Sequence, residues 1–406
     1  MYSFVICIYL LAVKLVSLFN KKVSLMVQGH SQVFSILREK IEPGKKYIWF
    51  HAASLGEFEQ GRPLMERIRR QYPDYKILLT FFSPSGYEVR KNYAGADVIC
   101  YLPFDTPRNV HRFLSLVNPC MAFFIKYEFW QNYLKGLQSR NIPVYSVSSI
   151  FRKEQVFFRW YGGRYYKVLT RFTHLFVQNE SSKNLLATLG ITNVTVVGDT
   201  RFDRVIEIFE QAKQLPLLEA FKQNKTVMVA GSSWQPDEDI FIRYFNEHPE
   251  MKLVIAPHVI GENHLTEIIG KLKRPYVRYT QATAEQVKEA DCLIIDCFGL
   301  LSSIYRYGEI AYVGGGFGVG IHNVLEAAVY GVPVLFGPNN QRFQEARQLL
   351  ATEGCFEIQD YASFKERMDR FCSDEAFLIE CGRRSGTYVK EHSGASDRVL
   401  SLVKFE

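Results

Sequence analysis

The sequence lacks the residue spacings that would assign it to several common classes of protein. Its eight cysteines contain no C-x-x-C pair and its nine histidines no H-x-x-x-H pattern, so neither a disulfide framework nor a zinc site is indicated. It has no G-x-x-x-x-G-K-[ST] phosphate loop and no low-complexity tract. Several cysteines lie in apolar surroundings, and we expect them to be reduced and buried in a cytosolic protein.

Length and charge limit the number of domains and the kinds of binding partner. A chain of 406 residues exceeds the roughly 250–300 residues at which one hydrophobic core stops growing, so two domains are expected. The formal net charge of +7 is modest. It is compatible with an acidic membrane surface or a phosphorylated substrate. We expect no nucleic-acid partner.

The N-terminus departs from this ordinary composition. Residues 4–19 form an apolar run with Lys14 as its single charge, and Lys21 and Lys22 follow. The run has no small-residue cleavage site, which argues against a removed secretory signal. It is also shorter than the ~20 residues that span a bilayer. It could span with Lys14 reaching the interface, lie in the interface, or form a buried helix. We predict that residues 1–22 anchor the chain at the cytoplasmic face of a membrane, because flanking lysines favour that side.

Strand patterns alternate with longer amphipathic stretches from Lys46 onward, which predicts an α/β fold with parallel sheets. The strands expected in the first half are Tyr47–His51, Lys76–Phe81, Val98–Leu102, Met121–Ile125, Val144–Val147, Leu175–Val177 and Val194–Val197. Those expected in the second half are Thr226–Ala230, Lys252–Ala256, Cys292–Ile295, Ala311–Val313 and Val332–Phe336.

These two series predict two Rossmann-like domains, at residues 23–204 and 225–385. A stretch rich in Lys, Gln and Glu is expected to form a helix and linker at 205–224. A C-terminal helix at 386–406 is expected to pack back on the first domain. The active site is then expected in the cleft between the halves, at the carboxyl ends of the strands.

The most informative stretch is rich in glycine. Tyr312–Pro338 has the pattern of a strand, a glycine loop, a helix over His322–Tyr330, a turn and a second strand. No frame of the loop has the G-x-G-x-x-G offsets of a dinucleotide-binding protein. The loop is either a flexible surface segment or a cradle whose bare amides and helix N-terminus bind an anionic group. Because Glu326 could accept a hydrogen bond from a sugar hydroxyl, a nucleotide sugar is the simplest ligand.

A carboxylate is expected at the start of the first long helix of the first domain. Glu57 closes the run His51-Ala-Ala-Ser-Leu-Gly-Glu57, which directly follows a strand. The positive end of the helix dipole is expected to lower the pKa of Glu57 and keep it ionised as a general base. Helix capping alone explains an acid at this place equally well. Glu59 falls elsewhere on the helix and is the weaker candidate.

Three further segments carry polar or aromatic groups. Ser232 and Ser233 follow a strand and could offer hydroxyls and amides to a phosphate. The segment Pro236–Asp239 resembles a D-x-D metal motif, but an acidic helix start after proline explains it better. Phe157–Lys167 is both aromatic and basic, which fits internal packing or, less well, contact with a phosphorylated lipid near the membrane.

The chain resembles the Kdo (3-deoxy-D-manno-octulosonic acid) transferases of lipopolysaccharide biosynthesis. The resemblance rests on ordered motifs in both halves, namely His51–Glu57, Arg62-Pro63, Glu128–Trp130, Gly198–Asp203, Ala256–His258 and His322–Glu326. It implies a GT-B glycosyltransferase that moves Kdo from CMP-Kdo to the lipid A precursor, lipid IVA, with inversion. It also implies action at the cytoplasmic face of the inner membrane, and neither a metal nor another cofactor.

The resemblance assigns roles to individual positions. Glu57 matches the general base that deprotonates the acceptor hydroxyl, and Arg201 matches a basic residue that stabilises the leaving CMP. The implied CMP contacts are Pro257, His258, Phe298, Gly299, Leu300, Asn323, Val324, Leu325 and Glu326. Lys126 stands where many members have glutamate. Either Glu128 takes over the acidic role or Lys126 contacts an anionic group such as the Kdo carboxylate. An ordinary ion pair at a strand end explains Glu128 equally well.

Two other functions stay open at this point. Another GT-B enzyme that uses a UDP-sugar would share the glycine-rich unit, but it would not need both the anchor and the His51–Glu57 run. A non-catalytic, membrane-tethered binding protein would not need Glu57, Asn323 and Glu326.

Overall fold

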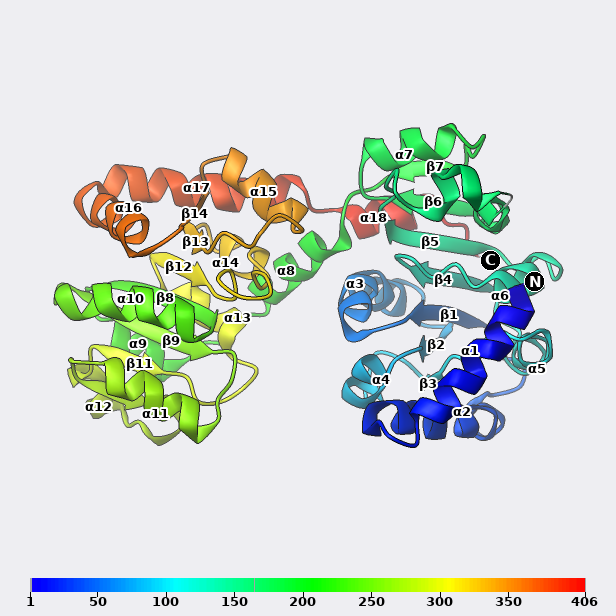
Figure 1. Cartoon of the computed structure of the whole chain (residues 1–406), viewed down its shortest axis with the longest axis horizontal. Helices are drawn as coiled ribbons and strands as arrows, with labels where there is room; N and C mark the ends of the chain where they lie inside the picture. The colour runs from blue at the N-terminus through cyan, green and yellow to red at the C-terminus, as the bar shows by residue number, and fades with distance from the viewer. Residues whose placement is uncertain (1, 164, 406) are drawn as a thin grey trace. The chain divides into compact units, whose positions relative to one another are not determined.

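The computed structural model describes residues 2–163 and 165–405. Met1 of the expected anchor, Arg164 of the aromatic and basic segment, and Glu406 of the expected C-terminal helix lie outside them. The chain forms two compact units (Figure 1). The first contains the residues up to Arg204 together with those from Ser393 onward, and the second contains Val205–His392.

The first unit is built on a parallel seven-stranded sheet with strand order β3-β2-β1-β4-β5-β6-β7. Its strands are β1 (Tyr47–Ala52), β2 (Lys76–Phe81), β3 (Val98–Tyr101), β4 (Met121–Ile125), β5 (Val144–Ser149), β6 (His174–Val177) and β7 (Val194–Val196). Its helices are α1 (Tyr2–Val16), α2 (Lys21–Lys40), α3 (Leu55–Gln71), α4 (Pro84–Arg90), α5 (Pro107–Val117), α6 (Gln131–Gln138), α7 (Glu180–Ala187) and α18 (Ala395–Leu400), with the 3-10 helices η1 (Val156–Phe158), η2 (Trp160–Gly162) and η3 (Tyr165–Arg171). All six residues of β1 are buried, as expected for a central strand covered on both faces.

The second unit repeats this plan with strand order β10-β11-β9-β8-β12-β13-β14, again parallel. Its strands are β8 (Thr226–Ser233), β9 (Met251–Pro257), β10 (Tyr276–Arg278), β11 (Cys292–Ile294), β12 (Ile310–Val313), β13 (Val334–Phe336) and β14 (Cys355–Glu357). Its helices are α9 (Pro216–Lys222), α10 (Gln235–Glu247), α11 (Glu262–Lys271), α12 (Ala284–Glu289), α13 (Leu301–Ile304), α14 (Leu325–Ala328), α15 (Gln344–Ala351), α16 (Tyr361–Ser373) and α17 (Glu375–Glu391), with η4 (Tyr279–Gln281) and η5 (Tyr305–Tyr307). Helix α8 (Thr200–Glu210) contains the boundary between the units. All the expected strands are present, and the short strands β10 and β14 were not expected.

The stretch 205–224 is an integral part of the second unit rather than an extended linker. Helix α9 packs against α12, and its residues Leu218 and Phe221 are fully buried. The C-terminal region also differs from the single helix expected at 386–406. Helix α17 ends at Glu391 in the second unit, and the short α18 begins at Ala395 in the first, where it packs on α3.

Asp203 holds the returning chain in place. Its buried carboxylate accepts hydrogen bonds from the backbone N–H groups of Gly394 (2.5 Å), Ala395 (3.2 Å) and Ser396 (2.6 Å). Gly394 has φ +87°, a left-handed conformation that glycine adopts at little cost. Asp203 therefore satisfies the free amides at the start of α18.

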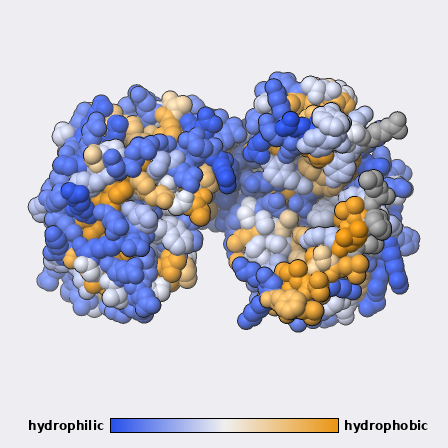
Figure 2. All heavy atoms as spheres, in the orientation of Figure 1, coloured by the Kyte–Doolittle hydropathy of each residue, from blue (hydrophilic) through white to orange (hydrophobic). Residues whose placement is uncertain are grey.

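Helix α1 lies on the first unit with one apolar face outward. Within the described residues, we find no helix with the length and apolar content that a bilayer crossing demands. Val13 is buried in the core, and the Tyr2 hydroxyl donates to Asp105 at 2.7 Å. The exposed apolar side chains of α1 and the turn after it are Val5, Ile8, Tyr9, Leu11, Leu15, Val16, Leu18 and Phe19. Figure 2 shows a band of hydrophobic residues here.

The seven described cysteines are free thiols. Cys100, Cys292, Cys355 and Cys381 are buried, as expected, whereas Cys372 is exposed.

Candidate active site

Each sheet has a point where the strand order reverses. In the first unit this point lies between β1 and β4, and in the second it lies between β8 and β12. In open α/β sheets, ligands bind outside the carboxyl ends of the strands at such a point. Glu57 follows β1, and Lys126 and Glu128 follow β4. In the second unit Ser232 and Ser233 are the last two residues of β8, and the glycine loop follows β12.

Glu57 is the third residue of α3, as predicted for the start of this helix. Ser54 is the N-cap in an extended conformation, and the Glu57 carboxylate reaches back over the helix start. Its Oε2 atom accepts hydrogen bonds from the N–H groups of Ala53 at 2.6 Å and Ser54 at 3.2 Å. The carboxylate therefore caps the helix and is fixed in place by backbone geometry.

The prediction that the helix dipole lowers the pKa of Glu57 is wrong. Burial raises the pKa of Glu57, and the charge of Glu128 raises it further. His51, the Ala53 amide and Lys126 act in the opposite direction without cancelling the rise. Desolvation and a like charge therefore outweigh the dipole and the cap. A carboxylate with a raised pKa is a stronger proton acceptor near neutral pH, which suits a general base.

A chain of hydrogen bonds fixes Glu128 beside Glu57. His51 Nε2 lies 2.9 Å from Glu128 Oε2, and the Trp130 indole donates to the same oxygen at 2.6 Å. On the other side of the ring, His51 Nδ1 lies 2.9 Å from the Thr80 hydroxyl, which accepts from the Trp49 indole at 2.8 Å. These contacts hold the Glu128 carboxylate at the site.

Lys126 has a constrained backbone beside the same site. Its φ of +61° is left-handed, its N–H donates to the Val147 carbonyl at 2.8 Å, and its carbonyl accepts from the Ser149 hydroxyl at 2.7 Å. Its charge acts to lower the pKa of Glu57, so the ammonium group lies near the carboxylate. Glu57 therefore has one acidic neighbour, the side chain of Glu128, and one basic neighbour, the side chain of Lys126.

Arg201 lies in the first turn of α8 and is paired with a buried acid. Its guanidinium donates to Asp199 Oδ2 through Nε at 2.8 Å and Nη2 at 2.7 Å. The adjacent Thr200 hydroxyl lies 2.8 Å from that of Ser148. These contacts hold the start of α8 to the end of β5. The role of Arg201 towards a leaving phosphate stays a prediction.

Three rings form a stack above the second sheet. His258 stacks on Trp234 with a centroid distance of 4.7 Å and on His322 with one of 4.5 Å. The rings follow β8, β9 and β12, and Pro257 is the last residue of β9. Burial lowers the pKa of His322, and the charge of His258 lowers it further. Of these rings only His258 was predicted as a ligand contact, although the motif that begins at His322 was recognised.

The glycine loop is not the open cradle of free amides that the sequence suggested. Gly314 N donates to the Gly231 carbonyl at 2.9 Å, and Gly315 N donates to Asp237 at 2.9 Å. Gly318 N and Gly320 N both donate to the Gly315 carbonyl. These four amides are therefore used within the unit. The helix expected over His322–Tyr330 is the single turn α14, too short to provide a strong dipole.

The glycines instead allow close packing of the backbone. A Cβ at Gly316 would lie 2.5 Å from Gly337 backbone atoms, and one at Gly314 would lie 2.5 Å from the Ser232 carbonyl oxygen. Gly315 has φ +92° and Gly320 has φ +134°. The loop is thus folded tightly against the strand ends.

Not every predicted contact residue can present its side chain to a ligand. Ser233 is fully buried and its hydroxyl donates to Glu238 at 3.0 Å, whereas Ser232 is half-buried. The side chains of Val324 and Leu325 are buried, so only their backbone can contribute.

The remaining predicted donor contacts reach solvent, apart from Pro257, which is buried. Asn323 is exposed and donates to Glu326 Oε1 at 3.0 Å. Phe298 is 76% exposed in the loop after β11, and Gly299 has φ +85°. Leu300 is half-buried and precedes α13. These groups are available to a ligand at the carboxyl side of the sheet.

Asp237, in the segment that resembles a D-x-D motif, has a structural role. It accepts hydrogen bonds from Trp234 N, Gly315 N and the Tyr312 hydroxyl, each at 2.9 Å. It thus joins the start of α10 to the glycine loop. No group of three or more metal-binding side chains occurs in the described part of the chain.

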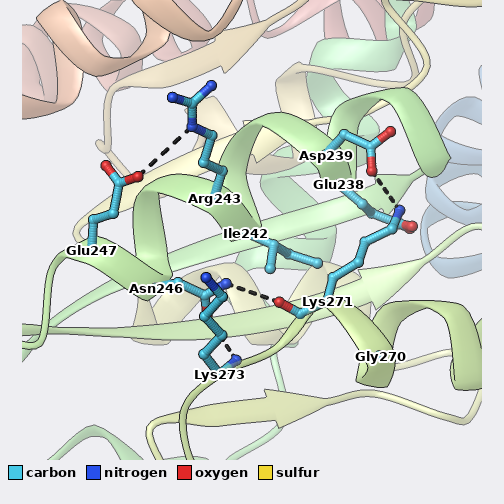
Figure 3. A pocket seen from close by; sticks show the side chains of 9 residues that line it. All are labelled: Glu238, Asp239, Ile242, Arg243, Asn246, Glu247, Gly270, Lys271 and Lys273. Atoms are coloured by element: carbon cyan, nitrogen blue, oxygen red, sulfur yellow. Dashed lines mark hydrogen bonds and ion pairs between the residues drawn. The ribbon is translucent and has the colours of Figure 1, made fainter.

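A cavity of about 380 Å³ lies between α10 and α11, away from the strand ends (Figure 3). Its charged side chains pair with one another, Lys271 with Asp239 at 2.7 Å and Arg243 with Glu247 at 3.7 Å. Its lining, as the described residues define it, includes none of the predicted site residues. We therefore place the candidate site at the two strand reversals.

The two Rossmann-like units define the fold class as that of the GT-B glycosyltransferases, and comparisons with solved structures agree. UDP-GlcNAc 2-epimerase from Neisseria meningitidis, bound to UDP-GlcNAc, matches with a TM-score of 0.61 at 14% identity, over 87% of this chain and 98% of that one. Acinetobacter baumannii MurG matches with a TM-score of 0.55 at 9% identity, over 88% and 98%. Identities this low show the fold alone.

Sequence comparisons show which enzymes of this class the chain is similar to. Residues 28–204 match the family model of 3-deoxy-D-manno-octulosonic-acid transferase (kdotransferase). The enzyme of that name from Haemophilus influenzae is 27% identical over 379 residues, 89% of this chain and 87% of the relative. The one from Aquifex aeolicus is 28% identical over 344 residues, 83% and 89%. Over most of its length the chain is therefore similar to enzymes named Kdo transferase, in line with the resemblance of its motifs.

Proposed function

We propose that this protein transfers Kdo from CMP-Kdo to a lipid A-type acceptor, with inversion at the anomeric carbon. The acceptor oxygen forms a bond to that carbon, the bond to the CMP phosphate breaks, and the acceptor proton passes to Glu57. The observation that carries this proposal is the half-buried Glu57 carboxylate, fixed by two backbone amides at the β1–β4 reversal, with a raised pKa.

In this mechanism Glu128 is a positioning residue that acts through Glu57. Its charge, held by His51 and Trp130, keeps the pKa of Glu57 raised. Lys126 limits that rise, so Glu57 can be ionised and still be basic near neutral pH. Arg201 is proposed to stabilise charge on the departing phosphate, which requires its guanidinium to serve both Asp199 and the ligand.

The second unit is proposed to hold the donor. The exposed edge of the ring stack, with His258 at its centre, offers imidazole groups to the phosphate. The half-buried Ser232 hydroxyl adds a donor from the end of β8, and Pro257, Phe298, Gly299 and Leu300 border the same edge of the sheet. Asn323 and Glu326 are proposed to bind the nucleotide ribose. We propose that neither a metal nor another cofactor takes part.

The acceptor is proposed to be lipid IVA, taken from the cytoplasmic face of the inner membrane. Helix α1 presents an outward apolar face, and the first 38 residues contain four basic and no acidic residues. Such a helix suits the interface of an anionic membrane, where its apolar side chains enter the headgroup boundary. We therefore propose interfacial attachment of the N-terminus.

The test is a reaction of the purified protein with CMP-Kdo and lipid IVA, followed by mass spectrometry of the lipid and measurement of released CMP. We expect one or more Kdo residues on the lipid, a CMP yield that matches them, and no effect of EDTA. In the same preparation, CMP should protect the protein against thermal unfolding better than UMP or UDP. Protection by UDP alone, without lipid modification, would contradict the proposal and favour a UDP-sugar enzyme.

A further inference from the structure

The aromatic loop of the first unit, which we define as residues 152–163, has two kinds of aromatic side chain. Phe157 is buried and stacks on Tyr165 with a centroid distance of 5.4 Å. Trp160 is 93% exposed and Tyr161 is 62% exposed. Internal packing therefore accounts for Phe157 and leaves the two larger rings at the tip of the loop in solvent. Exposed Trp and Tyr are typical of membrane interfaces, because one part of each ring system is apolar and another is polar.

A hollow of about 630 Å³ opens beside these rings. Phe158 and the half-buried Leu185 and Leu189 give it an apolar lining, and Lys153 and Arg159 also line it. Its volume is within the range of pockets that take small ligands. A hollow with apolar walls and cationic side chains matches an acyl chain attached to an anionic headgroup.

The charge of this region favours an anionic partner. Residues 129–179 contain eight Lys or Arg and one acidic residue, Glu154. The first 38 residues are the other strongly basic stretch, with four basic and no acidic residues. Each Lys or Arg near an anionic bilayer adds to the attraction between the protein and the membrane surface. Both stretches belong to the first unit, so both can face the same bilayer.

Contacts around Asp105 connect the aromatic loop to helix α1. The carboxylate of Asp105 accepts from the Tyr2 hydroxyl at 2.7 Å, and Ser3 accepts from Asn132 of α6 at 3.4 Å. Tyr165 lies near enough to Asp105 that this carboxylate contributes to raising the pKa of its phenol. The start of α1 therefore borders η3, which packs against η1 of the loop. The start of α1 and the loop are thus linked through η3 within the first unit.

We propose that the aromatic loop is a second membrane contact, in which Trp160 and Tyr161 enter the headgroup region and the hollow takes one acyl chain of a bilayer lipid. Lys153 and Arg159 meet the phosphate of that lipid. The inference rests on the proposed attachment of α1 to the membrane. Two contacts on one rigid unit fix its orientation on the bilayer, which a single helix lying in the interface does not.

The experiment measures binding of the full-length protein to vesicles of equal parts phosphatidylcholine and phosphatidylglycerol. The double variant Trp160→Ala/Tyr161→Ala should bind about tenfold more weakly. The variant lacks the two aromatic side chains whose transfer from water to the membrane interface favours binding. Ile379→Ala on α17 is the matched control, because Ile379 is as exposed as Tyr161 but belongs to the second unit, and it should bind normally. Vesicles with brominated acyl chains should quench indole emission in the unmodified protein and much less in Trp160→Phe.

A Leu11→Ser/Leu15→Ser variant of α1 tests the membrane attachment of α1 by itself. It thereby distinguishes this attachment from the membrane contact proposed for the aromatic loop. Normal binding by the loop variant, with binding lost in the α1 variant, would overturn the loop as a membrane contact and leave the α1 attachment standing. Normal binding by both variants would refute the attachment itself. A loop variant that binds vesicles normally but has a raised KM for the lipid acceptor would also overturn the inference, because the hollow would then serve the substrate.

Discussion

Both units are built on a parallel seven-stranded sheet, but they place different chemistry at their strand reversals. In the first unit, ionisable side chains converge, with Glu57 and Glu128 adjacent and His51 donating to Glu128. In the second unit, three stacked rings and tightly packed glycine backbone occupy the equivalent place. Proton transfer requires a carboxylate whose neighbours set its pKa, whereas donor binding requires a rigid surface of fixed shape. Under the proposed function, the same sheet edge therefore serves catalysis in the first unit and donor binding in the second.

The strongest test of this division replaces the base. Glu57→Gln keeps the size and one acceptor oxygen of the side chain but cannot take a proton, so turnover should fall by about 10²–10⁴-fold. CMP affinity, measured by calorimetry, should not change, because the proposed donor contacts lie in the second unit. Glu59→Gln on the same helix is the control. Glu59 pairs with Arg90 at 2.7 Å, so this variant should keep most of the activity. Near-normal turnover of Glu57→Gln would contradict the assignment of Glu57 as the general base.

A second test asks whether the glycines of the second unit are needed for packing. A Cβ at Gly316 would meet Gly337 backbone at 2.5 Å, whereas at Gly318 the nearest atom lies at 3.7 Å. Gly316→Ala should therefore lower the free energy of unfolding by about 1–3 kcal/mol, and Gly318→Ala should change it by less than about 0.5 kcal/mol. Denaturant unfolding measures both. Equal effects of the two substitutions would contradict the packing role.

A third test concerns the ring stack. His258→Ala removes the central ring and should weaken CMP binding about tenfold, from the loss of two stacking contacts and of an imidazole near the phosphate. His248→Ala is the matched control, because His248 also stacks on an aromatic ring, Tyr244, but precedes β9 at the opposite end of that strand. It should leave CMP affinity unchanged. An effect on turnover without one on CMP affinity would place His258 in the chemistry instead.

The smallest expected effects are shifts in the pH profile of kcat/KM. Glu57 must be ionised to act as a base, so activity falls as the pH drops through its raised pKa. Glu128→Gln removes a repulsion, lowers the pKa of Glu57 and should move the acid limb to lower pH. Lys126→Met removes an attraction and should move the limb to higher pH, whereas Lys135→Met on α6 should not move it. Shifts of Glu128→Gln and Lys126→Met in the same direction would contradict the proposed electrostatics.

The sequence predicted the sheets well because buried parallel strands are continuous apolar runs. It was less successful where a few side chains decide the outcome. Leu218 and Phe221 are fully buried, yet the polar residues around them suggested a linker. The position of Glu57 on α3 could be read from the strand-to-helix pattern, but its pKa depends on Glu128, 71 positions away in the chain. The glycine loop was recognised as special, but the partners of its amides, such as Asp237, could not be seen in the sequence.

The hydrogen bonds that Asp203 accepts from the amides of residues 394–396 affect the order in which the two units fold during synthesis. Synthesis on the ribosome runs from the N-terminus, so every residue of the second unit emerges before α18 is available. Until then α3, which bears Glu57, lacks the helix that covers it, and the buried Asp203 lacks these three amides. The second unit can therefore finish folding before the first does, although the first begins earlier. The unit that bears Glu57 is then the last to mature.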